Sequence, residues 1–140
     1  MIVVDASIWV SCLVPQDVYH EASRRWLEQY TGRGGRLVAP VLLLAEAAGA
    51  IARRTGQATL AFQAVDYLLH FPALRIVPVD QRLGRETARL AADLSLRGAD
   101  AVYVAVAHHL SIPLLTWDAE QHARAGKIIA CMSPLSPADV

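Results

Sequence analysis

Four acidic residues stand where carboxylates are unusual, and they define the chemistry available to this 140-residue sequence. Asp5 follows the run Ile2-Val3-Val4, and Asp118 follows Leu114-Leu115-Thr116. Both runs predict short buried strands of a parallel sheet. Ligands of open α/β sheets bind outside the carboxyl ends of the strands, so both acids are well placed for chemistry. Capping of the helix that follows each acid is the plainer interpretation, and it stays open at this point.

Glu46 is the only charged residue in the run VLLLAEAAGAIA, which extends from Val41 to Ala52. A surface helix shows polar residues on every turn of its outer face, so this run predicts a helix in which Glu46 is mostly buried. An isolated buried carboxylate is costly and must be protonated, paired or bound to a cation. Arg53 and Arg54 are too far along the helix to pair with it. An interhelical hydrogen bond from a neutral Glu46 is the alternative.

Asp100 opens a further helix, DAVYVAVA, that is apolar nearly all round and is expected to be central. An acid in the first turn is favoured by the helix dipole, and this alone explains the residue. The functional interpretation is that the helix directs the carboxylate at a shared metal site.

The four carboxylates would thus come from two strand ends and two buried helices, one from each. Like charges about 4 Å apart repel by roughly 4 kcal/mol at an effective dielectric of about 20, so the four acids converge only with protons or divalent cations. A site of oxygen ligands without His or Cys favours Mg²⁺ or Mn²⁺ over zinc. One or two such ions can activate water and stabilise the leaving oxygen in phosphodiester cleavage.

Short strands alternate with helices along the rest of the chain, which predicts a three-layer α/β/α sandwich around a mostly parallel sheet of four to five strands. Pro40 is expected in the first turn of a helix, and Arg97-Gly98-Ala99 is expected to separate two helices. We predict a single domain over residues 1–132 and a loose tail over 133–140. The expected strands cover 2–4, 37–39, 75–79, 113–116 and 127–132, and the expected helices cover 7–14, 19–30, 40–55, 58–70, 81–96 and 100–111, with a short helix after Asp118.

The composition excludes several classes of protein. Hydrophobic residues make up 54% and charged residues 19%, which excludes a disordered chain. Thirteen basic and thirteen acidic residues cancel, which excludes a strongly basic nucleic-acid clamp but leaves room for a local basic patch. No apolar run approaches the ~20 residues of a membrane span, and no signal peptide is visible. Cys12 and Cys131 lack zinc spacing and indicate reduced thiols. We therefore expect a cytoplasmic protein without a membrane partner.

Arginine is the other residue type that could bind a nucleic acid. The planar guanidinium group of arginine hydrogen-bonds well to phosphate, although a compositional bias and solvated helix ends explain each arginine equally well. His108-His109 lies near a helix end, where a structural or surface role is favoured. Ser7 lacks the G-x-S-x-G context of a serine nucleophile. The arginines that could line an RNA path are Arg24, Arg25, Arg33, Arg36, Arg53 and Arg54.

Taken in order, these segments resemble the PIN-domain family, and within it the single-domain VapC-type toxins of bacterial type II toxin–antitoxin systems. The ordered set spans most of the chain, whereas each motif alone is weak. The matching segments are Val3-Val4-Asp5-Ala6-Ser7 with Trp9, Glu46 in its apolar helix, Asp100-Ala101 with Ala105 and Ala107, and Leu115-Thr116-Trp117-Asp118.

The resemblance implies a Mg²⁺- or Mn²⁺-dependent endoribonuclease that acts as a toxin. In that interpretation Asp5, Glu46, Asp100 and Asp118 bind metal directly or through water. Ser7 and Thr116 match small hydroxyl positions of the family and would orient ligands or metal-bound water. The resemblance also implies a homodimer, RNA substrates such as transfer, ribosomal or messenger RNA, and a small VapB-like antitoxin encoded beside the toxin.

Other functions compete with this one. A PIN-like nuclease with an RNA-processing role outside toxin systems is the first alternative. A phosphoacceptor module is less favoured, since the chain has a single early Asp5 and its only lysine is Lys127, and since Glu46 stays unexplained. A non-catalytic scaffold is disfavoured because an unused buried acid cluster would only destabilise the fold.

Overall fold

Five parallel strands form one sheet at the centre of the computed structural model, which describes residues 1–135. The strands lie in the order β3-β2-β1-β4-β5. The second and third strands are thus added on one side of β1, and the fourth and fifth strands on its other side. The topological switch point therefore lies between β1 and β4. The strands are β1 (Ile2–Val4), β2 (Leu37–Pro40), β3 (Leu74–Val77), β4 (Leu114–Leu115) and β5 (Cys131–Met132).

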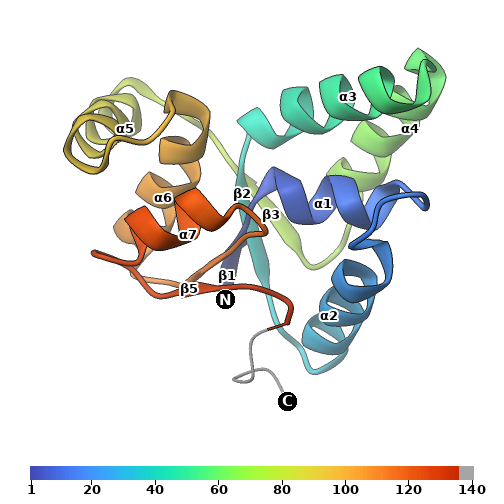
Figure 1. Cartoon of the computed structure of the whole chain (residues 1–140), viewed down its shortest axis with the longest axis horizontal. Helices are drawn as coiled ribbons and strands as arrows, with labels where there is room; N and C mark the ends of the chain where they lie inside the picture. The colour runs from blue at the N-terminus through green and yellow to red at the C-terminus, as the bar shows by residue number, and fades with distance from the viewer. Residues whose placement is uncertain (136–140) are drawn as a thin grey trace.

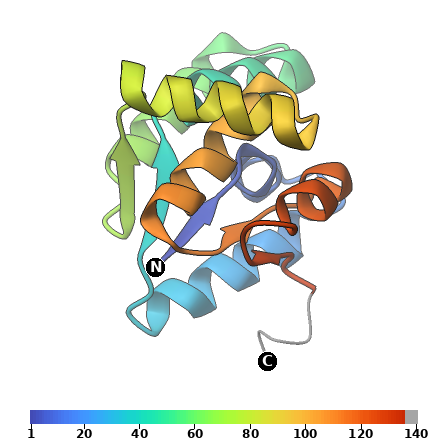
Figure 2. The same ribbon diagram turned by 90° about the vertical axis from the view of Figure 1, so that its left-hand side faces the viewer.

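Helices cover both faces of this sheet, as Figure 1 shows. Four helices from the first half of the chain lie on one side: α1 (Ala6–Leu13), α2 (His20–Gly32), α3 (Leu42–Thr55) and α4 (Ala58–Leu69). The other side carries α5 (Gln81–Leu94), α6 (Gly98–Leu110) and α7 (Ala119–Ala125), which face the viewer in Figure 2. The predicted three-layer α/β/α sandwich with a parallel sheet is confirmed.

The core explains why the central segments are apolar throughout. Every residue of β1 is buried, because the strand has neighbours on both edges and helices on both faces. The central helix α6 contacts both β1 and β2 and buries the unbroken run from Tyr103 to Ala107. The acid Asp100 therefore sits at the beginning of the helix that is packed most deeply against the sheet.

Two boundary predictions are wrong in ways that matter locally. Pro40 does not open a helix but is the last residue of β2, opposite Val77. The backbone N–H groups of Leu37 and Val41 donate hydrogen bonds to β3 and the residue that precedes it. Because successive residues of a strand alternate in direction, position 40 is not one of the donors to β3, and Pro40 removes no hydrogen bond between these two strands. The predicted break between the next two helices is present but shifted: it lies at residues 95–97 instead of 97–99, because Gly98 is already the first residue of α6.

The strand β5 is shorter than predicted. The chain after α7 is still turning, with the N–H groups of Ile128 and Ile129 both bonded to the carbonyl of Ala125, and pairing starts only at Cys131. Residues 136–140 of the predicted tail lie outside the described residues, so its boundary stays a prediction. Within residues 1–135, no helix is both long and apolar enough to cross a membrane.

Candidate active site

Asp5 and Asp118 lie at the same end of the sheet because β1 and β4 are parallel neighbours. The N–H of Asp5 donates to the carbonyl of Leu115 over 3.0 Å, which joins the two strand ends directly. Each acid also caps a helix: Asp5 Oδ2 accepts the N–H of Ser7, and Asp118 Oδ1 accepts the N–H of Gln121, both over 2.9 Å. The capping interpretation is thus confirmed for both acids. It leaves the second oxygen of each carboxylate for a different partner.

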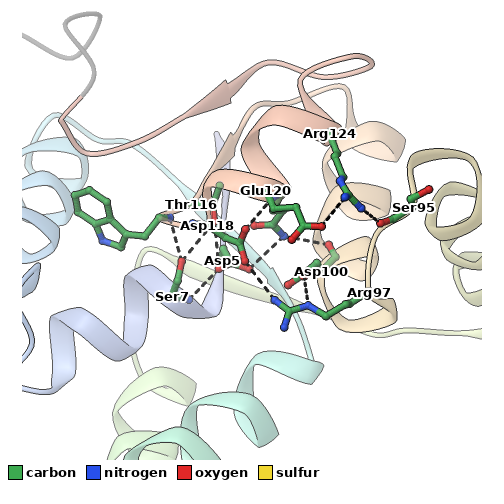
Figure 3. Close-up of polar contacts among 11 residues, drawn as sticks. Asp5, Ser7, Ser95, Arg97, Asp100, Thr116, Asp118, Glu120 and Arg124 are labelled. Carbon is green, nitrogen blue, oxygen red and sulfur yellow. Dashed lines mark hydrogen bonds and ion pairs between the residues drawn. The ribbon is translucent and has the colours of Figure 1, made fainter.

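The hydroxyls of Thr116 and Ser7 tie these two acids together. Thr116 Oγ1 lies 3.4 Å from Asp5 Oδ2, to which it donates, and accepts the N–H of Asp118 over 3.0 Å. Ser7 Oγ accepts the N–H of Trp117 over 3.1 Å. Thr116 is buried with the carboxyl of Asp5. In this arrangement, drawn in Figure 3, the two hydroxyls hold the segment after β4 in place, and Thr116 links the carboxylate of Asp5 to the backbone of Asp118.

Gln121 connects the same acids to α6. Its Nε2 donates to Asp5 Oδ1 over 3.4 Å and to the backbone carbonyl of Asp100 over 3.1 Å. The side chain is completely buried, and its Oε1 has no hydrogen-bond partner within the described part of the chain. A buried carbonyl oxygen without a hydrogen-bond partner is rare and costly. This oxygen belongs to the same side-chain amide group as the Nε2 atom that contacts Asp5.

Glu46 lies on α3, and it is half-buried rather than mostly buried as predicted. Its partner is the hydroxyl of Tyr103 on α6, which donates to Glu46 Oε1 over 2.7 Å. An interhelical hydrogen bond is therefore present, but Glu46 accepts it from Tyr103 instead of donating it. Partial burial raises the pKa of Glu46, the bond from Tyr103 lowers it, and the charges of Asp5 and Asp100 raise it further.

Asp100 is held by Arg97, the residue immediately before α6. Arg97 Nε lies 3.1 Å from Asp100 Oδ2, and its Nη2 lies 3.4 Å from Asp118 Oδ2. Figure 3 shows the guanidinium extending from Asp100 toward Asp118. The hydrogen bond to Asp100 and the charges of both acids raise the pKa of Arg97. A single guanidinium therefore joins an acid on a helix to an acid at a strand end.

The four acids influence one another, and we call Asp5, Glu46, Asp100 and Asp118 together the acid centre. Burial is the main reason that the pKa of Asp5 is raised; hydrogen bonds from Ser7 and Gln121 lower it, and the charge of Asp118 raises it. Partial burial is likewise the main reason that the pKa of Asp100 is raised. The hydrogen bond and charge of Arg97 lower this pKa, and the charges of Asp5 and Asp118 raise it. Mutual effects of this kind are characteristic of functional sites.

The donors of the acid centre suit a hard divalent cation, but their present arrangement does not form a closed ligand shell. The acids supply oxygen atoms alone, and Gln121 has an unpartnered buried oxygen beside them. Across residues 1–135, no three side chains among His, Cys, Asp and Glu converge closely enough to hold one metal ion. The position of Arg97 explains why the acids do not converge more closely, because its guanidinium lies between the carboxylates of Asp100 and Asp118 and contacts both. The metal ligands named from the sequence thus stay a prediction.

Three residues of this site were missed by the sequence reasoning: Arg97, Tyr103 and Gln121. Arg97 and Tyr103 lie three positions before and after Asp100, and Gln121 lies three positions after Asp118. Residues three apart on a helix share a face, so this spacing was the available signal. It was hidden because the helix was expected to begin only at Asp100 and because Tyr103 belongs to an otherwise apolar helix.

Comparison with known proteins places the chain in a structural context. The sequence profile described as "PIN domain" matches residues 2–127. No curated protein sequence matches the chain. Similar solved structures include VapC20, a sarcin-ricin loop cleaving toxin of Mycobacterium tuberculosis, with 21% identity, a TM-score of 0.75 and coverage of 88% of this chain and 94% of that one.

Two further solved structures show the same fold. FitAcB from Neisseria gonorrhoeae is 21% identical with a TM-score of 0.71, and the match covers 96% of this chain and 98% of that one. A toxin–antitoxin complex from Klebsiella pneumoniae is 15% identical with a TM-score of 0.71, covering 97% and 99% of the two chains. The match therefore extends over nearly the full length of both structures.

Proposed function

Because the chain belongs to the PIN-domain family, we propose that it is a Mg²⁺- or Mn²⁺-dependent endoribonuclease that serves as the toxin of a toxin–antitoxin pair. The observation that carries this proposal is the acid centre at the switch point of the sheet, where α/β folds bind their ligands. The similarity to VapC20, described as a toxin that cleaves the sarcin-ricin loop, supports RNA as the substrate class.

The proposed reaction is hydrolysis of an RNA phosphodiester. Water adds to phosphorus, the bond from phosphorus to the 3′ oxygen breaks, and the products carry a 5′-phosphate and a 3′-hydroxyl. When bound, the divalent cation would lower the pKa of the attacking water and neutralise charge on the phosphate. Asp5, Glu46, Asp100 and Asp118 are the proposed ligands.

The chain's own residues would orient this chemistry. Asp5 accepts hydrogen bonds from Ser7, Thr116 and Gln121, so its carboxylate has one orientation in the folded protein. Thr116 fixes Asp118 through the backbone N–H of that residue. Ser7 and Thr116 are therefore positioning residues in this proposal, and ligands held in place before substrate binds need no reorganisation during the reaction.

Asp5→Asn is the decisive variant. Cleavage of total RNA in Mn²⁺ should fall on the order of a thousandfold, because a first ligand contributes several kcal/mol of transition-state stabilisation. The metal-free variant should also unfold at a higher temperature than the wild type, since a buried charge has been removed. Gel analysis of the RNA with mapping of its new ends measures the first effect, and calorimetry measures the second.

Asp93→Asn is the matched control, because Asp93 is an exposed aspartate on α5. It should cleave RNA as the wild type does. Cleavage that persists in EDTA would reject the metal mechanism, and new ends with a 2′,3′-cyclic phosphate would reject the proposed hydrolysis. An active nuclease whose expression leaves growth unaffected would favour the RNA-processing alternative over the toxin.

We propose that the antitoxin binds at α4. We also propose that the protein is cytoplasmic and that two copies of the chain form a homodimer. Phe62, Tyr67 and Leu69 are exposed on this helix to 68%, 46% and 53%. A groove of about 770 Å³ runs beside it and includes Leu60 and Tyr67 in its lining. Co-expression with the product of a neighbouring small reading frame should give a complex, and Phe62→Ser should weaken it. A complex that Phe62→Ser leaves intact would exclude α4.

A further inference from the structure

Arg97 occupies an unusual place for a basic residue. It is the N-cap of α6, where the helix dipole disfavours a positive charge and where short polar side chains are preferred. Its side chain makes no capping hydrogen bond to the helix. The stability of α6 therefore does not explain why an arginine stands here.

The contacts of Arg97 do explain it. Its guanidinium uses two different nitrogen atoms, Nε for Asp100 and Nη2 for Asp118, and thus joins two of the four acids of the acid centre. The planar fork of arginine allows such a double contact, whereas the single ammonium of lysine does not. Arg97 supplies within the chain the positive charge that crowded carboxylates require.

We propose that Arg97 is an exchangeable cation of the acid centre: it holds Asp100 and Asp118 until a divalent cation takes them over, and it then binds the phosphate of the substrate. The first half rests on the contacts above and the second half rests on the proposed function. The side chain of Arg97 is 77% exposed, against 18% for Asp100 and 27% for Asp118. The guanidinium is therefore free to rotate away while the carboxylates stay.

The exchange is favourable on elementary grounds. Ion pairs of exposed side chains contribute little to stability, so releasing this guanidinium costs little. A divalent cation carries twice the charge and interacts with more than two of the acids. Once released, the guanidinium stays within one side-chain length of the acid centre, where a phosphodiester would be hydrolysed, and arginine binds phosphate oxygens through paired N–H groups.

Mn²⁺ binding measured by calorimetry tests the first half without any RNA. Arg97→Gln should bind Mn²⁺ about three- to tenfold more tightly than the wild type, because the competing charge is gone. Metal-free Arg97→Gln should also melt at a lower temperature than metal-free wild type, and saturating Mn²⁺ should remove that difference. A merely structural role for Arg97 would lower the melting temperature equally with and without metal.

The control is Arg89→Gln, since Arg89 is exposed on the neighbouring α5 and forms no ion pair with a described residue. It should leave both Mn²⁺ affinity and the metal dependence of melting unchanged. Weaker Mn²⁺ binding by Arg97→Gln, or unchanged binding, would overturn the exchange.

RNA cleavage at saturating Mn²⁺ tests the second half. Arg97→Gln should raise KM about tenfold with a smaller effect on kcat, and Arg97→Lys should recover part of the loss because it keeps the charge. An unchanged KM would overturn the phosphate contact and leave the exchange standing. A wild-type protein that binds Mn²⁺ as expected yet cleaves no RNA would instead reject the proposed function.

Discussion

The acid centre combines two pairs of acids that the protein holds in different ways. Asp5 and Asp118 follow strands, and their carboxylates accept hydrogen bonds from backbone N–H groups of the helices they cap. Glu46 and Asp100 lie within helices, and each depends on one long side chain: Tyr103 for the first and Arg97 for the second.

This difference separates a fixed half of the site from an adjustable one. A backbone N–H of α1 or α7 cannot leave its carboxylate unless the first turn of the helix unfolds. A side-chain donor only has to change its rotamer, which takes far less time and energy. The strand pair therefore defines where the site is, and the helix pair is free to respond to what binds there.

Thr116→Val would break the fixed half and should have the largest effect of the variants that spare the acids. The substitution leaves the N–H of Asp118 without its acceptor and removes a donor to Asp5 at a buried position. Urea denaturation should show a loss of about 1–3 kcal/mol. RNA cleavage should fall about 10- to 100-fold, as for other residues that orient metal ligands.

Thr116→Ser is the matched control, because it keeps the hydroxyl and removes only a methyl group. It should retain most of the activity. Full activity in Thr116→Val would mean that the hydroxyl does not position the acids and that the two halves of the site do not differ.

Tyr103→Phe probes the adjustable half and should have a smaller effect. The ring stays in the core, while Glu46 loses the hydrogen bond that lowers its pKa. We expect a loss of about 1 kcal/mol in the free energy of unfolding and about a tenfold decrease in cleavage. Tyr30→Phe on α2 should change neither quantity. An equal loss from both substitutions would show that Tyr103 acts through packing alone.

The pH dependence of stability should show the smallest effect. The folded pKa values of Asp5, Glu46 and Asp100 are raised, so the folded state binds protons more tightly than the unfolded state. The resulting stability is fully present below the unfolded values of about 4 and is lost as pH rises through the folded values. In EDTA, the protein should unfold at higher urea concentration near pH 5 than near pH 8.

Asp5→Asn should flatten this dependence, because it removes the most buried of the three acids. A wild-type stability that is constant or rises between these pH values would show that the ion pairs with Arg97 outweigh burial.

Much of the fold and the location of the acids could be predicted, because both depend on local patterns. The buried strands are unbroken apolar runs, and Asp5 and Asp118 follow them directly. Parallel strands then bring the two acids to the same edge of the sheet. The helix around Glu46 was also predictable, since one charge in twelve residues identifies it.

The partners of the acids could not be predicted in the same way. Arg97 is the extended N-cap residue of α6, and the start of that helix, which packs against the sheet, directs its side chain at Asp100 and Asp118. The hydroxyl of Tyr103 meets Glu46 only because α3 and α6 flank the same strands. Such contacts are set by distant parts of the chain, which a pattern within one segment does not contain.

The placement of β1 has a consequence for how the protein is made. Among the five strands β1 is synthesised first, yet its neighbour β4 and the adjoining Asp118 follow only after β2 and β3. Chains leave the ribosome from the amino terminus, so a nascent polypeptide carries Asp5 and Glu46 long before Asp118 emerges. The acid centre, and with it the proposed nuclease activity, is therefore completed only after β4 and Asp118 have been made and have packed against β1.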